Sequence, residues 1–390
     1  MKGRIRAAAM AAATLLPVAS ALAEGSAPTF KGHVALSRHH TTNALDGPLA
    51  VSDWYTLLRG ALEETLRHER GETRIAAQLE LRRYDRFDIE DDASVSVAAE
   101  TTLRAAERLE LRGGLSLRLA EEGDDLAIGN FLLGTRTARA TIAGNVQAGL
   151  QLSAATALVL TAAASREAPG DTRFEDDVLP GIRLEPRRDR FRLAATLKRS
   201  HGAFSYGLDA ASGTMRAAAL GEMPRLDVFD HVVRVQSEIA IADGPTLAAA
   251  AGLHLLSLPA AAFRELRPTY EIAARLPLDT RLSLRGAFRG AYDIASNDDP
   301  VAVWLRRLEI EAVYRAGPAL TFGGGFFAQA RDFIGMGNGE TGRGAYAEAI
   351  WQAGPKLALT LRLDVARHRL EPSMIGRESV DAHLAVRTEL

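Results

Sequence analysis

Four pairs of adjacent aspartates are the first candidates for chemistry in this sequence. Carboxylate oxygens are the ligands that Mg²⁺ and Ca²⁺ prefer, so such pairs can bridge a divalent cation to an anionic ligand such as lipopolysaccharide. None has the residue spacing of a calcium-binding loop, and solvated loop tips are the simpler interpretation. The doublets are Asp91-Asp92, Asp124-Asp125, Asp176-Asp177 and Asp298-Asp299.

Histidines are the second group of candidates. His39-His40 follows the first alternating segment of the sequence, and the other histidines are scattered. A hydrolase would need a nucleophile or an acid pair beside a histidine, and no motif selects one. The sequence has no cysteine, which excludes cysteine catalysis, cysteine-ligated metals and disulfides. We therefore predict no enzymatic activity, no cofactor and no metal site.

Charged residues at every second position are the most informative pattern. Arg285 and Arg289 fall on one side of a predicted strand, and Glu309 and Glu311 fall on the same side of the next. Arg facing Glu across water would create a transverse field that selects ions. The alternative is a set of structural salt bridges in a plugged or narrow barrel. The predicted lumen-facing residues are Arg74, Glu80, Arg82, Arg108, Glu110, Arg112, Arg192, Arg234, Glu238, Arg281, Arg285, Arg289, Glu309, Glu311 and Arg362.

Apolar residues occupy the positions between these charges. In the segment 108–120, RLELRGGLSLRLA, the leucines share one face and the charges the other. Such alternation over roughly ten residues is what a membrane-spanning β-strand requires, whereas a helix would distribute the charges all round its surface. The pattern recurs in at least five further segments, at 74–82, 190–198, 230–241, 281–289 and 356–365.

Two kinds of connection alternate along the chain. Short Pro- and Gly-containing turns are expected at 243–245, 277–279, 317–318 and 354–355, because these residues suit tight turns. Longer polar stretches, expected to be external loops, lie at 85–92, 120–130, 168–177, 293–300, 332–343 and 370–378. We predict an all-β fold, a single antiparallel transmembrane barrel of about 18 strands, within roughly 16 to 20. The count is least certain in the stretch 200–221.

The N-terminus predicts export. Lys2, Arg4 and Arg6 precede an apolar stretch, and Ala21-Leu22-Ala23 places small residues at a cleavage site. We expect residues 1–23 to be a cleaved signal peptide and residues 24–390 to form the barrel. Without a cysteine the chain cannot be a lipoprotein, and no later segment has the roughly 20 apolar residues of a membrane helix. A closed β-barrel is the remaining structure with which the chain could span a membrane.

The predicted partners follow from this location. We expect outer-membrane lipids and lipopolysaccharide of a Gram-negative bacterium around the barrel, and barrel-assembly machinery that reads the alternating last strand ending at Leu390. The net charge of −2 argues against nucleic acid. Aromatic residues near predicted strand ends suit the interfacial girdles. These are Tyr84, Tyr292, Tyr314 and Trp351.

One local resemblance adds to this interpretation. Ser52-Asp53-Trp54-Tyr55-Thr56-Leu57, followed by Arg82-Arg83-Tyr84-Asp85, resembles the early hairpin of β-barrel porins encoded in bacterial exopolysaccharide operons. The resemblance implies a wide outer-membrane barrel linked to polysaccharide secretion. We therefore expect a porin-like channel for passive passage of small solutes or saccharides. The alternative is a non-conducting surface barrel whose external loops bind a polymer or a partner protein.

Overall fold

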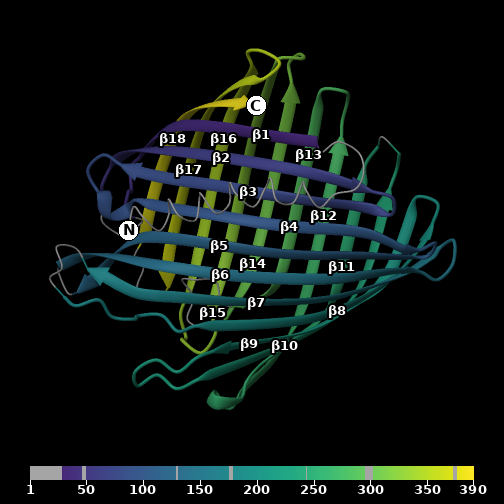
Figure 1. The fold of residues 1–390 in the computed structure, drawn as a ribbon, viewed down its shortest axis with the longest axis horizontal. Coiled ribbons are helices and arrows are strands. Elements are labelled where there is room, and N and C mark those ends of the chain that lie inside the picture. The colour runs from purple at the N-terminus through teal and green to yellow at the C-terminus, as the bar shows by residue number, and fades with distance from the viewer. Residues whose placement is uncertain are drawn as a thin grey trace.

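The computed structural model describes residues 29–45, 50–128, 131–174, 179–242, 244–294, 302–371 and 376–390, and the predicted signal peptide lies outside them. The described residues form 18 antiparallel strands in one closed sheet, as predicted (Figure 1). The strands are β1 (Thr29–Thr41), β2 (Asp53–His68), β3 (Gly71–Tyr84), β4 (Asp92–Ala106), β5 (Leu109–Ile128), β6 (Phe131–Gln151), β7 (Thr156–Phe174), β8 (Arg188–His201), β9 (Phe204–Ala217), β10 (Leu226–Ala240), β11 (Thr246–Leu258), β12 (Phe263–Pro277), β13 (Leu282–Ile294), β14 (Ala302–Arg315), β15 (Leu320–Phe333), β16 (Gly339–Gln352), β17 (Leu357–Glu371) and β18 (Gly376–Glu389).

Each strand pairs with its sequence neighbours, and β1 pairs with β18 to close the barrel. Figure 1 shows β1 to β8 running across one wall, with β11 to β18 behind them at a steep angle. Strands tilted by roughly 35–45° to a barrel axis produce this crossing between opposite walls. No helix in the described part of the chain is long and apolar enough to cross a membrane.

The strand register keeps charged and apolar residues on separate faces. Arg59 lies opposite Glu80, and the adjacent pair is Leu58 opposite Leu81. The same alternation continues round the barrel to β18 and β1. Large side chains on the apolar face are highly exposed, with Val235 at 65% and Leu361 at 61%. Exposing apolar surface to water costs roughly 25 cal/mol per Å², so this face belongs in lipid and the charged face in the lumen.

The connections confirm all four predicted turns and correct two of the predicted loops. The turns between β10 and β11, β12 and β13, β14 and β15, and β16 and β17 fall where they were predicted. The predicted loops 120–130 and 168–177 were wrong, because β5 continues to Ile128 and β7 to Phe174. About 9–11 residues span a bilayer, so these polar strands of 19 to 21 residues extend beyond it as hairpins.

The uncertain stretch 200–221 contains a single strand, β9. Its turn from β8 uses Gly202, whose φ of +59° is readily adopted only without a Cβ. The adjacent glycines of β15 make room for lumen side chains. A Cβ at Gly323 would lie 2.8 Å from the Glu348 Cγ, and one at Gly325 would collide with Tyr346. These glycines therefore allow a close approach of the neighbouring side chains, and the register of β15 with both neighbours is uninterrupted.

The acidic doublets do not form a common cluster in the described structure. Asp92 begins β4 and pairs with Arg82, while Asp91 accepts hydrogen bonds from the Tyr84 backbone N–H and from Arg83. Asp124-Asp125 falls within β5 rather than in a loop, and its side chains lie outside the description. The other two doublets, Asp176-Asp177 and Asp298-Asp299, lie outside the described residues. Asp91 and Asp92 therefore have local partners in the protein itself.

Candidate functional site

The lumen wall of β2 to β5 is lined by ion pairs between charged residues of opposite sign. Arg59 and Glu80 are 2.8 Å apart across β2 and β3. Arg82 lies 3.0 Å from Asp92, across β3 and β4. Arg112 and Glu110 pair within β5 at 2.8 Å. Because these side chains remain water-accessible, each pair contributes only about 0–1 kcal/mol to stability.

The wall of β8 to β10 contains pairs that reach over the strand between them. Arg192 of β8 contacts Asp230 of β10 at 3.1 Å, and Lys198 contacts Glu238 at 2.7 Å. The first pair passes over Gly213 of β9, where a Cβ would collide with the Asp230 carboxylate. Arg234 of β10 completes the network with Asp209 of β9, at 2.8 Å. A glycine on the intervening strand thus permits one of these bridges between β8 and β10.

Further predicted lumen residues also have acidic or basic partners. Arg74 lies 3.4 Å from Glu63, and Arg362 lies 2.7 Å from Asp364. Glu309 accepts a hydrogen bond from Arg307 at 2.7 Å. Most of the predicted lumen charges are therefore salt-bridged to neighbouring residues of the wall.

Arg285, Arg289 and Glu311 are predicted lumen residues for which the described structure gives no ion pair. Both arginines are exposed, and neither has an acidic group within 4.0 Å among the described residues. In the register Arg285 lies between Glu311 of β14 and Arg275 of β12. Arg289 lies between Arg307 of β14 and Glu271 of β12. Because neither arginine contacts an acidic group, both guanidinium groups are exposed to lumen water. This part of the wall can act on an ion that passes it.

Two predicted lumen residues lie outside the strands. Arg281 belongs to the turn before β13, which begins at Leu282, and its backbone N–H donates to Asp279. Arg108 lies in the turn before β5, which begins at Leu109. The backbone ladder nevertheless reaches both residues, because the carbonyl of Arg281 accepts from the Arg315 N–H and that of Arg108 from the Gln151 N–H, each at 2.8 Å.

The end of the β13–β14 hairpin leaves the wall and enters the lumen. The ladder between β12 and β13 stops at Tyr270 opposite Gly290, whereas β13 and β14 stay paired up to Ile294 opposite Ala302. Beyond the break, the Tyr292 hydroxyl donates to Glu265 at 2.8 Å. Glu265 belongs to the lumen face of β12. The end of the β13–β14 hairpin therefore lies on the lumen side of β12.

A buried apolar cluster forms where this hairpin end meets the lumen face of β10 and β11. Leu256 is fully buried, Val228 is 1% exposed, and Trp304 of β14 is 5% exposed. Ala302, Val303 and Trp304 are consecutive and all buried, so both faces of β14 are covered there. The cluster is completed by residues of β9, β11 and the β15–β16 loop, namely Met215, Ala217, Leu258 and Ile334. Fully burying one such large apolar side chain contributes roughly 1.5–3 kcal/mol.

Polar contacts tie the hairpin end to the wall. The guanidinium of Arg267 lies 5.4 Å from the Trp304 ring centroid, within range of a cation–π interaction. The same guanidinium pairs with Asp332 of β15 at 3.3 Å, and Asp332 also pairs with Arg306 at 3.3 Å. We refer to the inward-folded end, Tyr292 to Ile294 and Ala302 to Trp304, as the mouth hairpin. It narrows the lumen near the end where β1 stops and β18 starts.

Two of the four aromatic residues predicted for the interfacial girdle lie elsewhere in the structure. Tyr292 lies inside the barrel against Trp304, and Tyr84 packs on Tyr55 at the lumen face, so neither belongs to a girdle. Tyr314 and Trp351 are 42% and 52% exposed on the apolar face near the short turns, as expected for interfacial residues. The sequence signal for the mouth hairpin was the apolar character of both faces of 302–305, which breaks the alternation.

No protein-family model matches this chain, and the comparison with curated proteins gives no match. Solved structures do resemble it. The copper transporter OprC superposes with a TM-score of 0.53 at 8% identity, over 93% of this chain and 80% of that one. The ferric citrate transporter FecA gives 0.50 at 8% identity, over 94% and 79%. The FrpB iron transporter from Neisseria meningitidis gives 0.50 at 10% identity, over 87% and 62%.

At such identities the likeness is one of fold. A closed antiparallel sheet with an apolar outer face and a charged lumen, matched by these barrels, defines the class. The chain is an integral β-barrel of the cell outer membrane.

Proposed function

We propose that the barrel is a porin-like channel for passive passage of small solutes, with a preference for anions. The observation that carries the proposal is the exposed pair Arg285 and Arg289, which lack ion-pair partners among the described residues. Barrels of 16–18 strands are wide enough to leave an aqueous channel. In the register each arginine lies beside one acidic residue without contacting it, Arg285 beside Glu311 and Arg289 beside Glu271. Both guanidinium groups are therefore available to an ion in the lumen water.

Saccharides are the first solutes to test. The support for them is the resemblance of the first hairpin, from Ser52 to Asp85, to porins of exopolysaccharide operons. In the structure this hairpin lines the lumen with hydroxyl and aromatic groups, among them Tyr55 and Tyr84, whose ring centroids are 4.9 Å apart. Aromatic faces with hydrogen-bonding groups beside them suit a sugar ring. Passage of an exported polysaccharide would use the same surface.

Single-channel recording of the full chain in a planar bilayer tests the channel. We expect discrete conductance steps and a reversal potential that favours anions in a salt gradient. Changing both arginines, R285S with R289S, should shift the reversal potential toward cations, whereas R281S, in the turn, should leave it nearly unchanged. An identical reversal potential for the double variant would contradict the role of these arginines. Swelling of liposomes containing the protein in neutral sugars would test saccharide passage.

A second candidate function is a barrel that does not conduct at rest and binds a polymer or partner at its external loops. The mouth hairpin favours this candidate, because its buried cluster narrows the lumen. A folded and inserted chain that stays electrically silent would support it. Deleting an external loop would then abolish binding of the partner, whereas a channel would continue to conduct.

The assembly and lipid partners belong to the same proposal. The apolar outer face would contact membrane lipids and lipopolysaccharide. The last strand, β18, would be the part read by barrel-assembly machinery, with Val380, Leu384 and Val386 exposed on its outer side.

A further inference from the structure

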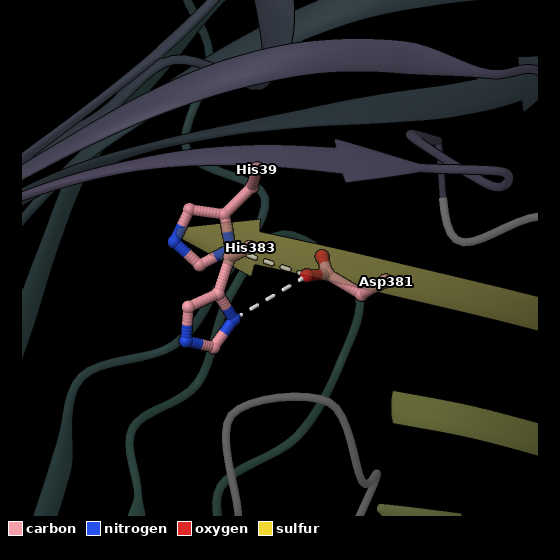
Figure 2. A group of neighbouring side chains, drawn as sticks. All are labelled: His39, Asp381 and His383. Carbon is pink, nitrogen blue, oxygen red and sulfur yellow. Dashed lines mark hydrogen bonds and ion pairs between the residues drawn. The ribbon is translucent and has the colours of Figure 1, made fainter. Parts of the chain in front are cut away.

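Two histidines and an aspartate meet at the seam that closes the barrel. His39 lies on β1, while Asp381 and His383 lie two residues apart on β18. The register places His39 directly opposite His383 and Thr41 opposite Asp381, so all three side chains share the lumen face. Figure 2 shows the two imidazoles and the carboxylate turned toward one another. Only the pairing of the first strand with the last creates this cluster.

The separations within the cluster suit a shared metal ion. Nδ1 of His39 lies 3.2 Å from Oδ1 of Asp381, and Nδ1 of His383 lies 3.8 Å from the same oxygen. One ligand atom from each residue can be chosen so that all lie within 4.8 Å of one another. Zinc binds nitrogen and oxygen at about 2.0–2.2 Å, which puts neighbouring tetrahedral ligand atoms about 3.3 Å apart. Small side-chain rotations close the remaining difference.

Neighbouring groups orient the proposed ligands. Nε2 of His39 lies 2.8 Å from the Ser37 hydroxyl, which itself donates to the Leu57 carbonyl at 3.4 Å. Nδ1 of His39 lies within hydrogen-bond distance of Oδ1 of Asp381, at 3.2 Å. In the tautomer in which Nε2 donates to Ser37, the Nδ1 lone pair is directed to the position that a cation would occupy beside the carboxylate. Metal-binding histidines commonly donate their second nitrogen in this way.

Tyr55 supports both sides of the cluster. Its hydroxyl donates to Oδ2 of Asp381 at 2.9 Å, which leaves Oδ1 for the histidines. Its ring stacks on His39 with centroids 4.3 Å apart. By contrast, the 3.8 Å separation between His383 and the carboxylate is too long for a hydrogen bond. The arrangement therefore fixes two ligands and leaves the third close enough to complete a site.

The donor set selects the class of ion. Two imidazoles and one carboxylate suit first-row divalent transition metals, whereas Mg²⁺ and Ca²⁺ prefer oxygen ligands alone. The side chains are 9%, 25% and 17% exposed for His39, Asp381 and His383, so an ion can enter from lumen water. Asp364 lies opposite Asp381 in the register of β17 and β18, and its ion-pair partner Arg362 lies opposite His383, so this neighbouring pair adds no net charge. Water would occupy the remaining coordination position.

We propose that His39, Asp381 and His383 form a lumen-facing binding site for a divalent transition-metal ion of the zinc class. The site is independent of the solute that the barrel passes.

Isothermal titration of the full chain in detergent, stripped of metal by a chelator, with Zn²⁺ tests the site. We expect one equivalent to bind with micromolar affinity, and Mg²⁺ not to compete. H383A should weaken binding by at least about tenfold, because it removes a ligand, and D381N should do so because it removes the charge of the carboxylate ligand. Co²⁺ provides a second measurement, because a four-coordinate site would give it a visible absorption band that H383A abolishes.

The matched control is H40A. His40 is adjacent in sequence but packs on Trp54, with ring centroids 4.9 Å apart, on the opposite face of β1. This variant should bind Zn²⁺ like the unchanged chain. Heat-modifiable migration on gels establishes that each variant is folded. The proposal is overturned if the folded chain shows no saturable binding, if H383A and D381N bind as tightly as the unchanged chain, or if H40A loses binding to the same extent.

Discussion

Two regions of the barrel share the same alternating sequence pattern but place their side chains differently. One is the ion-paired wall, formed by β2 to β5 and β8 to β10, and the other is the mouth hairpin of β13 and β14. In the wall, every second residue faces the lumen, as in the pair Arg59 and Glu80. In the mouth hairpin, Tyr292 and Trp304 occupy positions that would face lipid, but they are buried inside the barrel. The alternating sequence pattern therefore predicts whether a residue faces lipid or the lumen only where its strand is hydrogen-bonded to both neighbouring strands.

The two regions also differ in what holds them together. The wall uses water-accessible ion pairs, which contribute about 0–1 kcal/mol each. The mouth hairpin uses buried apolar contacts, which contribute roughly 1.5–3 kcal/mol for each large side chain. Truncating a residue of the hairpin should therefore change stability far more than neutralising a wall charge, and it should also change the pore.

Trp304 offers the largest expected effect. W304A should lower the free energy of unfolding by about 3–5 kcal/mol, because a large buried ring is lost and a cavity remains. It should also raise single-channel conductance, since the hairpin no longer packs against β11 and β12. The control is W351A, at an exposed outward position. Unchanged stability and conductance in W304A would mean that the hairpin does not pack inside the lumen.

Leu256 and Leu253 distinguish the packed lumen face of β11 from its lipid-facing side. L256A should cost about 2–5 kcal/mol in denaturant unfolding, because this side chain is fully buried. L253A, at a position on the same strand that is 52% exposed on the apolar face, should cost much less. Equal losses in the two variants would show that the faces of β11 are not distinguished as described.

Gly213 tests the wall itself. G213A should destabilise the barrel by about 1–3 kcal/mol, because the added methyl group collides with the Asp230 carboxylate and displaces it from Arg192. The matched control is G60A, since a Cβ at Gly60 would have no heavy atom within 4 Å. Thermal unfolding of both variants measures the difference. A neutral G213A would indicate that the Arg192–Asp230 bridge is not required.

The smallest expected effect is a pH dependence at the β12–β13 turn. Hydrogen bonds from the backbone N–H groups of Arg281 and Leu282 lower the pKa of Asp279. Because the folded-state pKa is lowered, this stabilisation is present above the unfolded value of about 4 and is lost as pH falls through the folded value. D279N should therefore flatten the pH dependence of the unfolding temperature below about pH 4. A pH profile that is unchanged in D279N would contradict this role.

The candidate metal site shows how far the sequence reaches. His39 and His383 were visible as histidines near the ends of the first and last alternating segments, but we predicted no metal there. Asp381 is separated from His39 by 342 residues, so no local spacing joins them. The sequence could indicate their proximity only together with the predicted fold, because closing a barrel with an even number of strands makes the first and last strands neighbours. The register that aligns His39 with His383 still had to come from the structure.

The sequence by itself determined that this chain is an outer-membrane barrel with short turns at one end. The physical reason is that lipid demands apolar residues on one face and complete backbone pairing, and both demands leave a period-two pattern. Only the tertiary structure decided which arginines remain unpaired, where β13 leaves β12, and which residues meet at the seam. These depend on distances between side chains far apart in the chain, which alternation along a single strand does not encode.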